Sequence, residues 1–169
     1  GGEQAPATQA GLQYTNEGKL LHPTDYQTGI FVGACPGTTY EEPPAKVDEL
    51  GKFGNVYLGP TAYAHYVPTG TFPEKTMLAL AVFEPVSEAT INKGGHFEGE
   101  QIALEIAVKD HDQFHEGWAY FDFQLGQELS QAFAKEKCYA CHVQHVADDN
   151  VFVQFYPILR GVKASKAHP

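Results

Sequence analysis

Thr76-Met77-Leu78-Ala79-Leu80-Ala81-Val82-Phe83 is the stretch that most clearly sets the fold of this chain. Side chains of a β-strand point alternately to the two faces of a sheet. One face would carry Thr76, Leu78, Leu80 and Val82, and the other would carry Met77, Ala79, Ala81 and Phe83. Since both sets are largely apolar, we expect a strand that is covered on both faces.

Further strands are predicted on both sides of this stretch. Residues 29–35 and 53–58 are short apolar runs that end close to turn-forming proline and glycine residues. Residues 102–109 and 118–123 alternate between apolar and other side chains, as a strand does. The chain therefore carries at least five candidate strands.

Helices are predicted to be few and short. Residues 61–67 follow Pro60 and precede Pro68, which favours a short helix between the two prolines. Residues 127–142 read as a helix, residues 158–162 as a last helical turn, and residues 151–156 as either strand or helix. Strands followed by helices favour an α+β fold, with a predominantly antiparallel sheet and a few short helices.

Length and composition indicate one domain. A chain of 169 residues with 43% hydrophobic residues is large enough to bury a sizeable core. We expect a flexible N-terminal segment over residues 1–12, a single domain over residues 13–163, and a tail over residues 164–169.

Cys138-Tyr139-Ala140-Cys141-His142 is the stretch that carries the chemistry. Two cysteines at this spacing followed by histidine form the attachment signature of haem c. The two thiols would form thioether links to one porphyrin, and the imidazole would be the proximal iron ligand. The sequence thus predicts one covalently bound haem c, attached late in the chain.

Two other uses of these residues stay open. A thioredoxin-like pair would follow a buried strand and open a helix, whereas a helix-like segment precedes this motif. A zinc site would need Cys138, Cys141, His142 and His145 as its four ligands, because the chain has no second cysteine pair. The remaining cysteine, Cys35, is expected to be a buried and inert thiol.

Charge and hydropathy exclude several classes of partner. The net charge of −10 disfavours nucleic acid and anionic membrane surfaces. No apolar run approaches the roughly 18 residues of a membrane span. Because haem c is attached outside the bacterial cytoplasm, we expect a periplasmic protein whose leader is absent from this chain.

Several stretches point to one family when they are taken together. They are Asn55-Val56-Tyr57-Leu58, Tyr63-Ala64-His65-Tyr66, Thr69-Gly70-Thr71-Phe72-Pro73, Leu104 to Asp110, Gly117 to Phe121, and Cys138 to His142 followed by Ala147-Asp148-Asp149 and Val151-Phe152-Val153-Gln154-Phe155-Tyr156-Pro157. From about residue 25 to residue 162, the chain resembles the cytochrome P460 family, which includes cytochrome c′-beta.

The resemblance implies an antiparallel β fold, a homodimer and a five-coordinate haem c. It assigns the thioethers to Cys138 and Cys141, and the iron to His142. Members of the P460 type oxidise hydroxylamine and carry a lysine bonded to the porphyrin, whereas the c′-beta type binds nitric oxide or carbon monoxide in an apolar distal pocket. Leu80 occupies the lysine position here, and Lys75 would lie on the opposite face if both residues belong to one strand.

Other residues are candidates for the haem surroundings. The candidate distal pocket comprises Leu80, Leu78, Phe53, Phe72 and Phe31, although any single one of them is better explained as ordinary core. Arg160 is the only arginine and suits a haem propionate or a proximal carbonyl, or else an exposed ion pair.

Alternative iron ligands and proton carriers are harder to single out. Met77 is expected to be core, and surface positions are expected for His65, His96, His111 and His115. The acids that could include a distal proton relay are Asp148, Asp149, Glu98, Glu100 and Glu105.

Three functions remain in view at this stage. The first is a gas-binding cytochrome with a five-coordinate iron, and the second is a hydroxylamine-oxidising enzyme. The third is a six-coordinate electron carrier that works with a redox partner protein. The absence of the crosslinking lysine favours the first.

Overall fold

The computed structural model describes residues 11–37, 51–87, 91, 93–134, 136–138, 142, 144–145 and 148–166. In this part of the chain, a five-stranded sheet has the strand order β2-β3-β4-β5-β6, and all neighbours are antiparallel. Its strands are β2 (Ile30–Ala34), β3 (Phe53–Leu58), β4 (Met77–Val86), β5 (Phe97–Lys109) and β6 (Trp118–Gln124). The expected α+β, predominantly antiparallel fold is confirmed.

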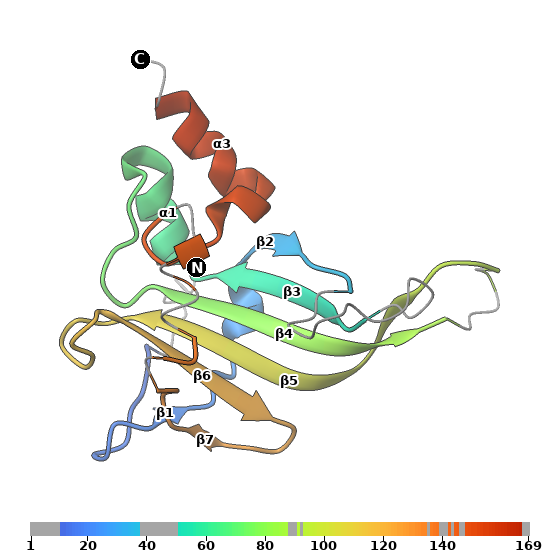
Figure 1. Cartoon of the computed structure of the whole chain (residues 1–169), viewed down its shortest axis with the longest axis horizontal. Helices are drawn as coiled ribbons and strands as arrows, with labels where there is room; N and C mark the ends of the chain where they lie inside the picture. The colour runs from blue at the N-terminus through green and yellow to red at the C-terminus, as the bar shows by residue number, and fades with distance from the viewer. Residues whose placement is uncertain are drawn as a thin grey trace, which may run out of the picture.

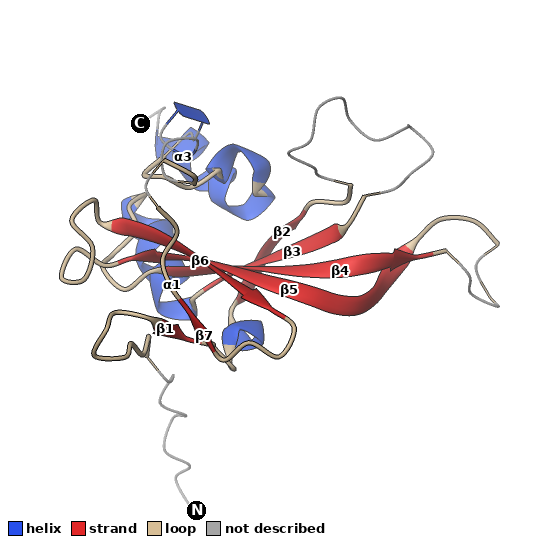
Figure 2. Ribbon diagram, turned by 60° about the horizontal axis from the view of Figure 1, so that its bottom comes forward, coloured by secondary structure: helices blue, strands red, loops and turns tan. Residues whose placement is uncertain are grey.

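Smaller elements cover both sides of this sheet. Helices α1 (Pro60–Thr69) and α3 (Pro157–Lys166) lie on one side, and a two-stranded sheet of β1 (Leu20–Leu21) and β7 (Leu129–Ser130) lies on the other (Figure 1). Two short 3-10 helices, η1 (Tyr26–Thr28) and η2 (Val153–Phe155), complete the described elements. The long strands β4 and β5 extend together beyond their neighbours (Figure 2).

The core has two parts, one on each face of the large sheet. The face toward α1 and α3, which we call the motif face, packs Val56, Leu58, Leu78, Trp118 and Tyr120 against these helices and against Cys138. The opposite face packs Ala79, Ala81, Leu104, Ile106 and Phe121 against Leu20 and Tyr26. The alternation predicted for residues 76–83 is therefore confirmed, and both faces of β4 are covered.

The predicted helix over residues 127–142 is wrong for every described residue up to Cys138, none of which is helical. Leu129 and Ser130 form β7 instead, where they pair with Leu21 and Leu20 of β1. The side chain of Leu20 is fully buried by this arrangement, and Ser130 is buried as well. Tertiary pairing thus overrides the helical composition of the segment, as it commonly does.

The other helix predictions need smaller corrections. Helix α1 runs past Pro68 to Thr69, because Gly70 closes it in a left-handed conformation with its N–H donating to the carbonyl of Tyr66 at 2.6 Å. Of the two options for residues 151–156, the helical one is closer, since residues 153–155 form the short 3-10 helix η2. Helix α3 is longer than the predicted last turn and reaches Lys166, which lies in the predicted tail. The predicted flexible segment lies almost wholly outside the described residues.

Candidate functional site

A helical turn carries two of the three motif residues that matter most. The backbone N–H of His142 donates to the carbonyl of Cys138 at 3.0 Å, which is the hydrogen bond of one α-helical turn. Cys138 is half-buried and packs against the core of the motif face. Cys141 lies outside the described residues.

The imidazole of His142 is held in one tautomer by a backbone carbonyl. Its Nδ1 lies 2.9 Å from the carbonyl oxygen of Asn150, and a carbonyl oxygen can only accept. Nδ1 therefore carries the hydrogen, and in the neutral ring Nε2 presents a lone pair. The ring is fixed between two aromatic side chains, with centroid distances of 4.4 Å to Tyr120 and 4.6 Å to Phe152.

The surroundings of His142 favour the form that can bind a metal. Burial lowers the pKa of this imidazole, and the hydrogen bond to Asn150 only partly opposes that effect. Neutral imidazole is the form that ligates iron or another transition metal. These surroundings thus favour the neutral imidazole of His142, with Nε2 available to a metal.

The carbonyl that orients His142 belongs to an unusual turn. Asp149 and Asn150 both have positive φ, of 41° and 59°, and the N–H of Val151 donates to the carbonyl of Asp148 at 2.7 Å. Aspartate and asparagine enter the left-handed region more readily than most residues other than glycine. The sequence Asp148-Asp149-Asn150 is therefore suited to this turn.

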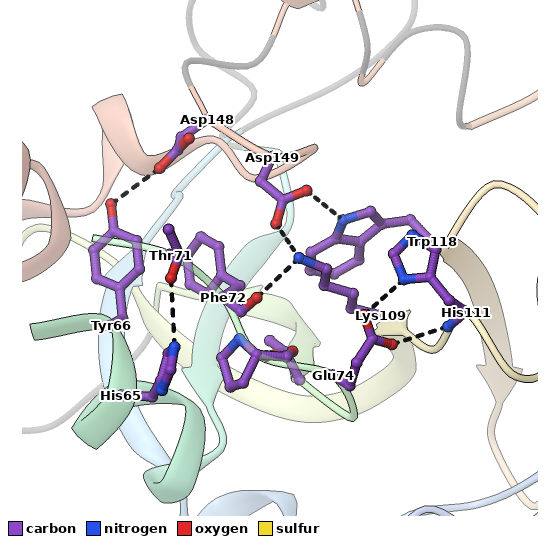
Figure 3. Close-up of polar contacts among 12 residues, drawn as sticks. His65, Tyr66, Thr71, Phe72, Glu74, Lys109, His111, Trp118, Asp148 and Asp149 are labelled. Atoms are coloured by element: carbon purple, nitrogen blue, oxygen red, sulfur yellow. Dashed lines mark hydrogen bonds and ion pairs between the residues drawn. The ribbon is translucent and has the colours of Figure 1, made fainter. Parts of the chain in front are cut away.

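Two strands of the large sheet anchor this turn through Asp149 (Figure 3). The ammonium of Lys109, at the end of β5, lies 2.6 Å from Oδ2 of Asp149, and the indole N–H of Trp118, at the start of β6, donates to Oδ1 at 3.1 Å. Lys109 also donates to the carbonyl of Phe72 at 2.8 Å. Both carboxylate oxygens of Asp149 are thereby engaged.

A further contact reaches the same turn from α1. The buried hydroxyl of Tyr66 donates to Oδ2 of Asp148 at 3.4 Å, and its ring stacks on Phe72 at a centroid distance of 4.4 Å. Desolvation, reinforced by the charge of Asp148, raises the pKa of Tyr66 to about 12. The phenol is therefore neutral at ordinary pH.

Beside the motif, part of the motif face is more open than the rest. Leu80 pairs with Glu105 across β4 and β5, and Glu105 pairs with Asp122 across β5 and β6. Leu80 and Asp122 are half-buried, whereas Glu105 is exposed. Leu80, Glu105 and Asp122 are called the open patch below.

The open patch also contains two neighbouring carboxyl groups, those of Asp122 and Glu105. Oδ1 of Asp122 is buried and has no hydrogen-bond partner among the described residues. Desolvation, followed by the charge of Asp122, raises the pKa of the Glu105 carboxyl, although water still reaches this side chain. An apolar side chain and two acidic side chains thus share this part of the motif face.

The structure brings only some of the predicted pocket residues together. Leu80 and Leu78 lie on the motif face with Cys138, and Phe72 is buried in the same core between Tyr66 and Trp118. Phe53 and Phe31 lie elsewhere, since Phe53 pairs with Phe83 on the opposite face and Phe31 packs on Tyr57 there.

Lys75 is separated from Leu80, but not for the reason expected. It precedes β4 in a turn, with a φ of 64°, so counting along one strand does not apply to it. Its ammonium lies 2.6 Å from the buried carboxylate of Asp110. Met77 packs against the core of the opposite face, as expected for a core residue.

The remaining candidates lie at the surface or away from the motif. Surface positions are confirmed for His65, His96, His111 and His115, and His145 is also exposed. Arg160 is exposed on α3. Cys35 is half-buried, and its thiol donates to the carbonyl of Gly54 at 3.6 Å.

The residues present fit a covalently held haem. Cys138 and His142 share one turn, His142 presents a lone pair on Nε2, and aromatic side chains fix its ring. The neighbouring open patch supplies partly uncovered sheet surface next to the motif. This donor set and tautomer are those of a proximal haem histidine.

Comparison with known proteins agrees with this geometry. The model of the family described as Cytochrome P460 matches residues 23–153, which include the large sheet, α1 and the motif. The chain belongs to the cytochrome P460 family and is a c-type haem protein, with haem c as its covalent cofactor. No curated protein matches the chain. Among the described residues, no helix is both long and apolar enough to cross a membrane.

Sequence reasoning missed the residues that hold the turn at residues 148–151. Lys109, Trp118 and Asp149 fall within the stretches that resemble the family, yet none of them was assigned a contact with the others. The pair Asp149-Asn150 did carry a turn signal. The acceptor of the hydrogen bond from His142 is the backbone carbonyl of Asn150, and a sequence pattern of side chains does not predict such a contact.

Proposed function

We propose that this chain is a five-coordinate c-type cytochrome that binds nitric oxide or carbon monoxide. Cys138 and Cys141 would form the thioethers, and Nε2 of His142 would bind the iron on the proximal side. Haem c supplies an iron with one vacant coordination position. The observation that carries the proposal is Leu80, an apolar residue on the motif face at the position of the crosslinking lysine.

The chain's own residues would do three things for such a ligand. Asn150 orients His142 through its carbonyl, so that one imidazole nitrogen remains available to the iron. Leu80 would present an apolar surface to the ligand, which favours neutral diatomic ligands over charged ones. Met77 packs against the core of the opposite face, which disfavours a six-coordinate electron carrier with methionine as the second ligand.

One observation favours a second candidate, the oxidation of hydroxylamine. That reaction releases protons, and Glu105, with its raised pKa beside Asp122, is a suitable proton acceptor. The missing lysine speaks against it, because Lys75 is bound to Asp110. We rank hydroxylamine oxidation below gas binding for that reason.

The test is to compare the intact protein with its His142→Gly variant. The variant is expected to keep the mass of a chain with one haem, since both thioethers remain, but to lose the spectrum of a histidine-ligated ferrous iron. Hydroxylamine is expected to leave the oxidised protein unreduced. Steady hydroxylamine-dependent reduction, together with a modified porphyrin mass, would favour the enzyme instead.

The wider setting belongs to the same proposal. We infer a periplasmic homodimer in which residues 13–163 form the haem-binding domain, with a redox partner protein to set the iron's oxidation state. Arg160, exposed on α3, would contact a propionate only if the haem extends toward that helix. Mass photometry or sedimentation of the haem-loaded protein tests the dimer directly.

A further inference from the structure

We propose that Asp149 is a positioning residue for the proximal ligand: held by Lys109 and Trp118, it fixes the Asn150 carbonyl and so sets the strength of the bond between His142 and iron. This inference rests on the proposed role of His142 as the iron ligand. It adds a determinant that lies outside the haem motif and touches neither the iron nor His142 itself.

The first step is the direct hydrogen bond. Nδ1 of His142 donates to the carbonyl of Asn150 at 2.9 Å, which leaves Nε2 as the nitrogen that would bind the iron. A hydrogen bond donated from Nδ1 shifts electron density toward Nε2 and makes the imidazole a stronger ligand. The position of one carbonyl oxygen therefore controls the electronic character of the ligand.

The second step is the conformation that aims this carbonyl. Asp149 and Asn150 are consecutive non-glycine residues with positive φ, a conformation that costs some free energy even for aspartate and asparagine. Within the turn, the Val151 N–H donates to the Asp148 carbonyl at 2.7 Å. An anchor at Asp149 would add to that hydrogen bond in holding the Asn150 carbonyl toward His142.

The third step identifies that anchor. Nζ of Lys109 lies 2.6 Å from Oδ2 of Asp149, and Nε1 of Trp118 donates to Oδ1 at 3.1 Å. Lys109 and Trp118 are paired with each other across β5 and β6. Trp118 is buried, and the Lys109 side chain is only 14% exposed, so both donors are fixed by the sheet. Figure 3 shows them converging on Asp149 from the sheet. The large sheet thus holds Asp149 in place, and through Asp149 it holds the carbonyl that accepts the hydrogen bond from His142.

The experiment measures the iron–histidine bond directly in the haem-loaded protein. Resonance Raman spectra of the ferrous form give the iron–histidine stretching frequency, and a redox titration gives the midpoint potential. Asp149→Ala is expected to lower the frequency and to raise the potential, because a weaker hydrogen bond makes His142 a weaker donor. The ratio of histidine-bound to histidine-free nitric oxide complex should fall by about fivefold to tenfold, the equivalent of one ordinary hydrogen bond.

Graded variants separate positioning from general loosening. Asp149→Asn keeps an acceptor for Trp118 but loses the charge pair with Lys109, so it should give a smaller shift in the same direction. Trp118→Phe keeps an aromatic ring and removes the N–H donor, at the cost of a smaller side chain in the core, and it is the second variant if Asp149→Ala does not fold. Tyr66→Phe removes the other contact to the turn, at Asp148, and should leave the frequency unchanged.

The outcomes separate this inference from the function on which it rests. An unchanged frequency in folded Asp149→Ala and Trp118→Phe would overturn the inference, and so would an equal shift in Tyr66→Phe. If His142→Gly retains the iron–histidine band, the proposed ligand itself is wrong. A band that is lost in His142→Gly and shifted in the Asp149 series supports both.

Discussion

Replacing Gly54 by alanine perturbs the packing beneath Leu80 with the smallest possible side chain. Gly54 is buried in β3, and a Cβ at this position would lie 2.7 Å from Cδ1 of Leu80 and 2.8 Å from Sγ of Cys35. Carbon atoms in favourable contact are about 3.5–4.0 Å apart, so both neighbours must move by roughly 1 Å. Overpacking of this kind costs about 1–3 kcal/mol.

The open patch determines where in that range the cost falls. Leu80 is half-buried, so its side chain can swing outward over the sheet, whereas Cys35 is tied to the Gly54 carbonyl at 3.6 Å. We therefore expect Gly54→Ala to lower the free energy of unfolding by about 1–2 kcal/mol. The outward movement of Leu80 should also slow carbon monoxide binding, if Leu80 lines the distal side.

Urea unfolding of the haem-loaded protein and flash photolysis of its carbon monoxide complex measure these two effects. In the Leu80→Ala background the closer clash is absent, so Gly54→Ala should cost less there, and carbon monoxide should bind faster than in the parent. Gly161→Ala is the matched control, because nothing lies within 4 Å of its added Cβ in α3. Equal costs of Gly54→Ala in the two backgrounds would refute the contact between Gly54 and Leu80 as the cause.

Two further predictions concern the contacts that hold the turn at residues 148–151. Lys109→Met leaves the Asp149 carboxylate without its cation and should cost about 2–3 kcal/mol, below the full buried-pair value because Asp149 is 33% exposed. In the Lys109→Met background, Asp149→Asn should lower the free energy of unfolding by less than it does in the parent protein. Strictly additive changes in the urea midpoint would show that Lys109 and Asp149 are not coupled. The pKa of Tyr66 is about 12 in the folded protein, whereas that of an unfolded tyrosine is about 10. The neutral phenol should therefore contribute fully to stability below about pH 10, and this contribution should be lost as the pH rises from about 10 to about 12. Tyr66→Phe should therefore flatten the alkaline fall of the unfolding free energy, and an unchanged slope between about pH 10 and about pH 12 would assign that fall to other groups.

The strands were predictable because their sequence pattern and their burial agree. Residues 53–58 match β3, and the two faces expected for residues 76–83 are the two faces of β4. Each of these strands has apolar side chains on both faces, and that pattern is visible without knowledge of the neighbours. The bounds were less well predicted, since β5 begins at Phe97, five residues before the predicted strand, and β4 continues to Val86.

Elements that depend on distant partners were not predictable in the same way. Residues 129–130 have no strand pattern of their own and become β7 only because β1 lies beside them. The same limit applies to the site. The sequence located the haem motif, but the contacts of Asp149 with Lys109 and Trp118 join residues 40 and 31 positions apart. The fold alone brings them together.

The optical spectrum of the ferrous protein, recorded before and after adding carbon monoxide, tests the central claim most directly. A haem c held by His142 alone predicts a high-spin ferrous spectrum that changes to that of a low-spin complex when carbon monoxide is added. A low-spin ferrous spectrum that carbon monoxide leaves unchanged would mean that a second protein ligand occupies the iron, which contradicts gas binding at a vacant position.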